Sequence, residues 1–278
     1  MFDVVPVGSE ITRRLSRRRP LMTNDFNLHS RLSGIALCRF VAVPRPMTEL
    51  VGVDGCAEGW IFVVEADGRL EVGVVPRLES LLDSVTNSAI VTIDVPIGLT
   101  ECGPRECDVE ARRVLGSPRA SSVFPAPVRA CLGAATYAEA CEAHHCADGR
   151  RMSQQAFGIL KKIGEVNDVL TRNPGLQARV REVHPEVCFA RWNGGKAMSH
   201  RKSRRAGRLE REALIESVWP GERVRLRGLI RGRRYKADDL NDAFAALWTA
   251  RRIRNHKSAV LPVSPPKDAV GLRMEIVV

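Results

Sequence analysis

An apolar run stops at a carboxylate in Leu50-Val51-Gly52-Val53-Asp54-Gly55, and a second run does the same in Ala89-Ile90-Val91-Thr92-Ile93-Asp94. Both runs are uncharged until that residue and rich in β-branched side chains, which indicates strands buried on both faces of a sheet. Val95-Pro96 follows the second run, and proline ends the pairing there because it has no amide donor. A charge at the end of such a strand is costly unless something compensates it, and a metal cation is one compensation.

A third segment, residues 236–250, predicts a helix with two acids near its start. Asp239 and Asp242 are three residues apart, so they share one helix face and can address one ion together. Taken singly, each acid has an ordinary interpretation as a helix N-terminal residue or a turn residue. Taken together, three elements far apart in the sequence each carry acids at one end. This arrangement predicts one metal site formed by Asp54, Asp94, Asp239 and Asp242.

The order of the predicted elements indicates a mixed α/β sheet. The strand to Asp54 and strands over 60–65 and 70–75 are joined by tight turns, which predicts an antiparallel meander. A helix over 78–85 leads to the strand ending at Asp94, and a strand-helix-strand unit of this kind runs parallel. If the first and fourth strands are neighbours, Asp54 and Asp94 end about one strand spacing, ~4.8 Å, apart. A fifth strand is predicted at 180–183, and further helices near 107–115, 136–145 and 153–172.

Length and composition fit an ordinary globular protein, with 278 residues, 44% hydrophobic and 27% charged. There is no apolar stretch near 20 residues, so we expect no transmembrane helix and no membrane partner. Eight cysteines are scattered along the chain rather than grouped in a short framework, which favours a reduced, cytoplasmic protein. The segment Cys141-Glu142-Ala143-His144-His145-Cys146 has no second ligand pair at a suitable spacing, so we assign no zinc site to it.

The net charge of +11 is concentrated in two regions. Residues 1–48 hold eight Arg against three acids, residues 201–236 hold thirteen Lys or Arg against four acids, and the remainder is mildly acidic. We interpret residues 1–46 as a disordered basic arm or a mis-annotated start, with the main domain over 47–278. The second region is a basic helical insert near 196–236. It is either a solvated helical face or a nucleic-acid contact, for which the candidate phosphate-binding residues are Lys202, Arg204, Arg205 and Arg211.

Four more residues are candidate ligands or bases. Glu58 adds a negative charge close to Asp54 in the sequence, whereas Glu182, His184 and Glu186 lie at the end of the fifth predicted strand and just beyond it. A histidine at such a position is more often structural than a metal ligand.

Six motifs follow one another over about residues 49–278: Val51–Cys56 with Gly59-Trp60, Ile93–Leu99, Ser122–Pro125, Glu182–Glu186, Asp239–Ala243 and Gly271–Ile276. In this order they resemble the domain of unknown function family 429, which is described as predicted RNase H-like nucleases. The resemblance implies an RNase H-like sheet of order 3-2-1-4-5, flanked by helices with helical insertions. It also implies two-metal phosphodiester hydrolysis with the four aspartates as ligands. The chain departs from the family pattern at Ala57-Glu58, Ser153-Gln154-Gln155 and Val277-Val278.

The sequence therefore predicts a metal-dependent nuclease that acts on nucleic acid. Oxygen-only ligands favour Mg²⁺ or Mn²⁺ over Zn²⁺, and two such ions would activate water. In this mechanism Asp54 bridges both ions, Asp94 and Asp242 hold one each, and Asp239 completes the shell. Two alternatives stay open. One is a non-catalytic nucleic-acid or protein-binding module on the same scaffold, and the other is an actin-like phosphotransferase, which needs glycine-rich phosphate loops from a duplicated domain.

Overall fold

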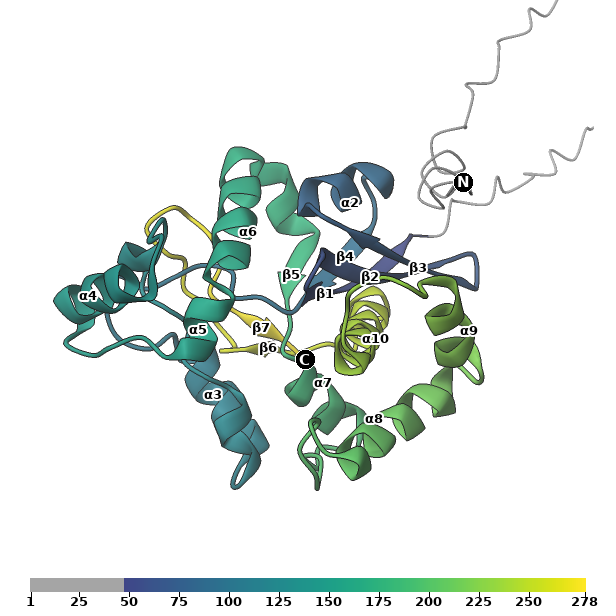
Figure 1. Cartoon of the computed structure of the whole chain (residues 1–278). Helices are drawn as coiled ribbons and strands as arrows, with labels where there is room; N and C mark the ends of the chain where they lie inside the picture. The colour runs from purple at the N-terminus through teal and green to yellow at the C-terminus, as the bar shows by residue number, and fades with distance from the viewer. Residues whose placement is uncertain (1–47) are drawn as a thin grey trace, which may run out of the picture. The chain divides into compact units, whose positions relative to one another are not determined.

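A five-stranded mixed sheet lies at the centre of residues 48–278, the part of the chain that the computed structural model describes (Figure 1). The expectation for residues 1–46 lies outside these described residues. The strands are β1 (Leu50–Cys56), β2 (Gly59–Ala66), β3 (Arg69–Val75), β4 (Ile90–Ile93) and β5 (Val180–Glu182). Their order is β3-β2-β1-β4-β5, with antiparallel pairing among β1, β2 and β3 and parallel pairing of β4 with β1 and β5. The predicted sheet order is confirmed.

The first hairpin extends further than the sequence indicated. β1 does not end at Asp54 but continues to Cys56, which pairs with Gly59 across a two-residue turn. Gly59 has a φ of 124°, a conformation that glycine adopts without the steric cost of a Cβ. On the other side of β1 the parallel ladder stops earlier, where the amide of Asp94 donates to the carbonyl of Val53 at 3.0 Å. Asp54 and Asp94 therefore come directly after Val53 and Ile93, the last residues that pair between β1 and β4, although Asp54 still pairs with Ile61 of β2.

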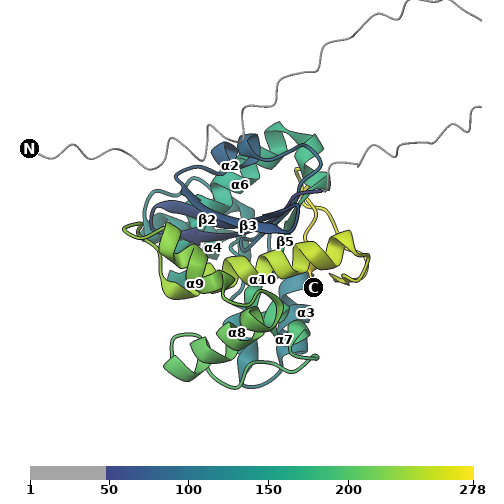
Figure 2. The same ribbon diagram turned by 90° about the vertical axis from the view of Figure 1, so that its right-hand side faces the viewer.

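Helices cover both faces of the sheet (Figure 1, Figure 2). α2 (Leu78–Ser84) and α6 (Leu160–Arg172) lie on one face, and α10 (Ala237–Arg254) crosses the other. The other α-helices are α3 (Glu106–Leu115), α4 (Tyr137–Asp148), α5 (Gln154–Gly158), α7 (Pro185–Trp192), α8 (Arg205–Val218) and α9 (Glu222–Leu229). Short 3-10 helices are η1 (Arg119–Ser122), η2 (Arg129–Cys131) and η3 (Pro174–Ala178), and a small second sheet pairs β6 (Val260–Leu261) with β7 (Ile276–Val277).

One apolar layer lies on each face of the sheet. Val51, Val53 and Trp60 pack with α2 and α6, whereas Ile61 and Phe244 belong to the layer beneath α10. Both faces of β1 are thus buried, as its uncharged sequence predicted. Within residues 48–278, no helix combines the length and the apolar character needed to cross a membrane.

Gly52 determines how closely α10 approaches the sheet. A Cβ at this position would lie only 2.1 Å from the carbonyl oxygen of Ala243 in α10. Thr92, the register partner of Gly52 on β4, donates its hydroxyl hydrogen to the carbonyl oxygen of Ala246 at 2.7 Å. Since side chains two residues apart along a strand share a face, Asp54 comes to the same side of the sheet as Gly52. The close approach therefore brings the start of α10, which carries Asp242, next to Asp54 and Asp94.

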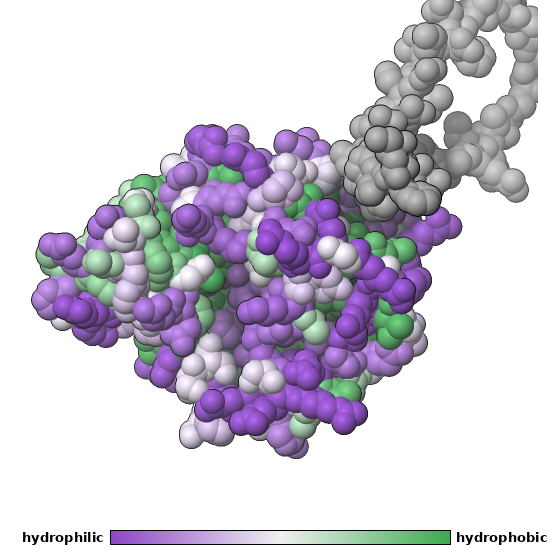
Figure 3. Space-filling model, in the orientation of Figure 1, coloured by the Kyte–Doolittle hydropathy of each residue, from purple (hydrophilic) through white to green (hydrophobic). Residues whose placement is uncertain are grey.

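The predicted basic insert contains α8 and α9, and the surface over α8 is predominantly hydrophilic (Figure 3). Several of its arginines pair with acids of the same chain. Arg223 binds Glu212 and Arg225 binds Glu222, each at 2.5 Å, while Arg233 binds Glu58 at 2.9 Å. A part of the positive charge of the insert is therefore neutralised within the fold.

Candidate metal centre

Three carboxylates from three separate elements converge at the carboxyl ends of β1 and β4. Asp54 of β1, Asp94 directly after β4 and Asp242 of α10 each offer an oxygen, and these oxygens all lie within 4.8 Å of one another. Asp54 and Asp242 are buried, with 8% and 1% of their surface exposed, and Asp94 is partly buried. This spacing allows one divalent cation to contact all three carboxylates.

Burial and mutual repulsion disfavour three negative charges at this place. Desolvation, followed by repulsion from Asp94 and Asp242, raises the pKa of Asp54 well above its ordinary value. Desolvation, followed by repulsion from Asp242, raises the pKa of Asp94 to about 8. Desolvation raises the pKa of Asp242 to about 6, against the opposing attraction of Lys202. A cation bound among the carboxylates would offset the repulsion and keep them ionised.

The two oxygens of Asp242 have different surroundings. Oδ2 accepts a hydrogen bond from Lys202 Nζ at 2.5 Å, and the same contact is an ion pair between the two side chains. Oδ1 is buried and has no hydrogen-bond partner among the described residues. Such an unsatisfied buried acceptor costs about 1–3 kcal/mol. A hard divalent ion is a partner suited to this oxygen, so the donor set fits Mg²⁺ or Mn²⁺.

Two of these three carboxylates, those of Asp54 and Asp94, open on a cleft of about 700 Å³. Asp54, Asp94 and Asp239 line it together with several cations, which are Arg105, Arg119, Lys162, Arg201, Lys202 and Lys236. The remaining walls include η1 and the segment that leads from β5 into α7. The walls also carry the acids Asp108, Glu182, Glu186 and Asp238, so charges of both signs surround the acidic cluster.

Asp239, the fourth predicted ligand, lies beside the cluster rather than in it. Its Oδ2 accepts a hydrogen bond from the backbone amide of Lys236 at 2.7 Å, so this carboxylate caps the start of α10. It is nevertheless close enough to Asp54 to contribute to the raised pKa of that residue. The structure thus brings together three of the four predicted aspartates and leaves Asp239 at the edge of the cleft.

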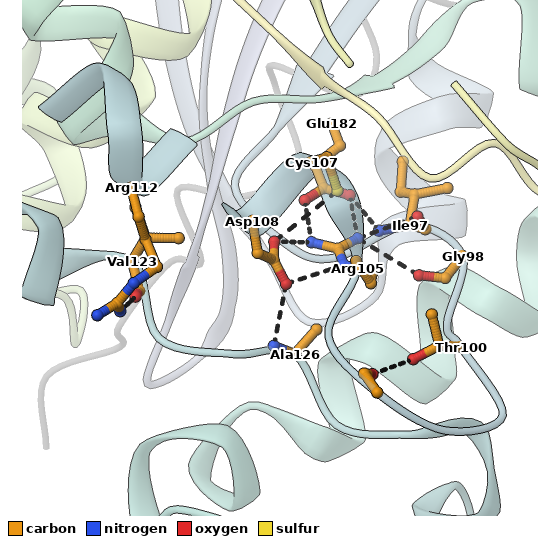
Figure 4. A network of polar contacts seen from close by, with 11 residues as sticks. Ile97, Gly98, Thr100, Arg105, Cys107, Asp108, Arg112, Val123, Ala126 and Glu182 are labelled. Carbon is orange, nitrogen blue, oxygen red and sulfur yellow. Dashed lines mark hydrogen bonds and ion pairs between the residues drawn. The ribbon is translucent and has the colours of Figure 1, made fainter. Parts of the chain in front are cut away.

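Glu182 is held by a buried arginine (Figure 4). Arg105 donates to Glu182 Oε1 at 2.7 Å and also binds Asp108 at 2.6 Å, and Glu182 Oε2 accepts from the amide of Ile97 at 2.6 Å. Desolvation raises the pKa of Glu182 to about 7 although Arg105 opposes the shift. Cys107, Asp108 and Glu182 also have ligand atoms within 4.8 Å of one another, but the guanidinium already satisfies both carboxylates. We interpret this network as support for the loop after β4.

Glu186 and Arg211 form a second buried ion pair. The guanidinium contacts Glu186 Oε2 at 2.6 Å, and Arg211 has no exposed surface. This corrects the expectation that Arg211 contacts phosphate, because a fully buried guanidinium cannot reach a ligand in solvent. The local sequence could not show the pairing, since the two residues come from different helices.

The other predicted residues have distinct environments. His184 lines the cleft, and its buried Nδ1 has no hydrogen-bond partner within the described residues. Burial lowers the pKa of His184, which favours the neutral imidazole. Glu58 lies in the β1–β2 turn, where it binds Arg233 and the amide of Arg234. Arg204 and Arg205 are exposed at the start of α8.

Besides Arg105, two cations of the cleft, Arg119 and Lys162, lie outside the predicted basic insert. Arg119 belongs to η1 and is buried, and Lys162 of α6 donates to the carbonyl of Gly59 while its Nζ lies 4.5 Å from the centroid of the Trp60 ring. Neither residue stands in a charged run or beside a strand end. Their positions follow from tertiary packing, and no local pattern points to them.

The fold and the cleft define an α/β protein with a mixed 3-2-1-4-5 sheet and a buried acidic cluster at the ends of its parallel strands. Residues 52–267 match the family model described as protein of unknown function (DUF429), so the chain belongs to that family. Neither the curated proteins nor the solved structures contain a match to this chain.

Proposed function

We propose that the protein is a metal-dependent nuclease that hydrolyses phosphodiester bonds of nucleic acid. The observation that carries this proposal is the convergence of Asp54, Asp94 and Asp242, one of whose buried oxygens has no partner. Carboxylate oxygens select Mg²⁺ or Mn²⁺, and we propose two such ions, with Asp239 at the edge of the same site. Bound there, the metal would lower the pKa of a water molecule and offset charge on the phosphate.

The chain itself contributes binding and charge. The three aspartates hold the cations, and the backbone contact of Gly52 with α10 keeps Asp242 beside the strand ends. Lys202 lies at the acidic cluster and Arg201 lies at the cleft wall, where both can attract a phosphate backbone. The exposed Arg204 and Arg205 extend this positive surface along α8. Seven cysteines of the described chain are unpaired, which supports a reducing, cytoplasmic compartment for the activity.

The test is a cleavage assay with Mn²⁺ or Mg²⁺ on single-stranded, duplex, hybrid and branched substrates. The wild-type protein should cut at least one of them, and Asp94→Asn should abolish the cutting because it removes an ionisable ligand. Asp83→Asn makes the same chemical change at an exposed position of α2 and should cut at the wild-type rate. The proposal fails if Asp94→Asn cuts as fast as this control.

One observation favours a second candidate, a non-catalytic nucleic-acid-binding module. Lys202 already neutralises Asp242, so the cluster has a cation of its own. In a binding module, DNA or RNA would be retained in EDTA and the acid-to-amide variants would bind as the wild type does. In a nuclease, EDTA would abolish turnover.

A further inference from the structure

Arg119 is a buried arginine that lacks an acidic partner. Only 7% of its surface is exposed, and its Nε is buried without a hydrogen-bond partner. No carboxylate among residues 48–278 lies within ion-pair distance of its guanidinium. A buried charge without a partner is strongly disfavoured, so this position calls for an explanation.

The other deeply buried arginines of the described chain show the usual solution. Arg105 binds Asp108 and Glu182, Arg211 binds Glu186, and Arg223 binds Glu212. Each of these guanidinium groups has its counter-charge within the fold. Arg119 differs from them in this respect, because its buried Nε has no acceptor and no described carboxylate pairs with its guanidinium.

The location of Arg119 indicates where a counter-charge could come from. It lines the same cleft as Asp54 and Asp94, on the wall formed by η1, and Ser121 and Ser122 of η1 line the cleft beside it. A ligand in the cleft can thus reach the guanidinium and the carboxylates at once. The guanidinium presents a planar set of donors that matches two phosphate oxygens, and such charge-assisted pairs are among the stronger hydrogen bonds.

We propose that Arg119 binds a phosphate of the substrate strand adjacent to the phosphate held at the acidic cluster. This inference rests on the proposed nuclease function and assigns a substrate-binding residue to it. The bound phosphate supplies the negative charge that no described carboxylate provides to Arg119. Arg119 then fixes the position of the strand in the cleft, while the aspartates and their metal act on the neighbouring bond.

The experiment measures the binding of a fluorescent 12-nucleotide single strand, as DNA and as RNA, to the full chain in EDTA over a range of salt concentrations. Arg119→Met should weaken binding by about tenfold or more, the effect of one charge-assisted pair. It should also reduce the slope of log Kd against log salt by about 0.7, as expected when one contact to single-stranded phosphate is lost. Arg119→Lys keeps the charge and should recover the slope. Arg113→Met, an exposed arginine of α3, is the matched control.

Thermal unfolding separates binding from folding. Since Arg119 is buried without a partner, Arg119→Met should leave the Tm unchanged or raise it, whereas a structural arginine would lower it. Equal Kd and slope for Arg119→Met and Arg113→Met would overturn the inference, and if the wild type still cuts, the nuclease proposal survives. Arg119-dependent binding without Mn²⁺-dependent cutting would support the phosphate site and refute the nuclease. A wild-type protein that neither binds nor cuts refutes both.

Discussion

Adding one methyl group at Gly52 should disrupt both the fold and the acidic cluster. In Gly52→Ala the new Cβ would lie 2.1 Å from the carbonyl oxygen of Ala243 and 2.2 Å from the amide nitrogen of Leu247. Both atoms belong to the backbone of α10, so no side-chain rotation can relieve the overlap and the helix must move away from β1. Overpacking of this kind costs about 3 kcal/mol or more. For a domain of this size that corresponds to a Tm lower by roughly 6–12 °C.

The assay is thermal unfolding followed by circular dichroism, with and without Mn²⁺. Moving α10 also moves Asp242, so the Mn²⁺-induced rise in Tm should shrink along with the Tm itself. Gly164→Ala in α6 is the matched control, because a Cβ there meets nothing within 4 Å and alanine favours a helix over glycine by up to ~1 kcal/mol. A Gly52→Ala protein with the Tm of the wild type would refute the packing argument.

Four other predictions follow from the charged groups of the structure. Because the pKa of Asp94 is raised to about 8 and that of Asp54 is also raised, protons compete with the metal. Calorimetry should show Mn²⁺ affinity rising at least about tenfold per unit from pH 6 to pH 8, and a flat profile would contradict this. In the metal-free protein the same raised pKa means that the contribution of Asp94 to stability is present below its ordinary pKa and is lost as the pH rises towards 8, which urea unfolding at several pH values can measure. Lys202→Met should tighten Mn²⁺ binding, because the Lys202 ammonium beside Asp242 repels a divalent ion more strongly than it repels a competing proton. Unchanged Mn²⁺ affinity would place the ion elsewhere. Arg211→Met should destabilise the protein by about 3–5 kcal/mol because it leaves Glu186 buried and unpaired, whereas adding Glu186→Leu should restore most of that loss in urea unfolding.

Local patterns in the sequence predicted the strands of the sheet and the elements that carry Asp54, Asp94 and Asp242. The uncharged runs before Asp54 and Asp94 predicted two buried strands, and the helix between them predicted that the strands run parallel. Their register in the sheet places the two acids side by side, as expected for neighbouring strands. The sheet order agrees with the resemblance to the family. The end of β1 was predicted two residues too early, because the strand continues to Cys56 and the hairpin turn is Ala57-Glu58.

The partners of the charged side chains could not be predicted in the same way. A run of arginines has the same appearance whether its members face solvent, as Arg204 does, or pair with a buried acid, as Arg211 does. The distinction depends on how α7 and α8 pack, which involves contacts between residues distant in the sequence. Arg119 is the extreme case, since only its burial and its missing partner set it apart from other arginines.

The acidic cluster takes its members from β1, β4 and α10, so it cannot exist on a ribosome-bound chain that still lacks α10. A nascent polypeptide would hold two of the three carboxylates and no complete coordination sphere. The proposed hydrolytic activity would therefore require that α10 has emerged and docked on the sheet.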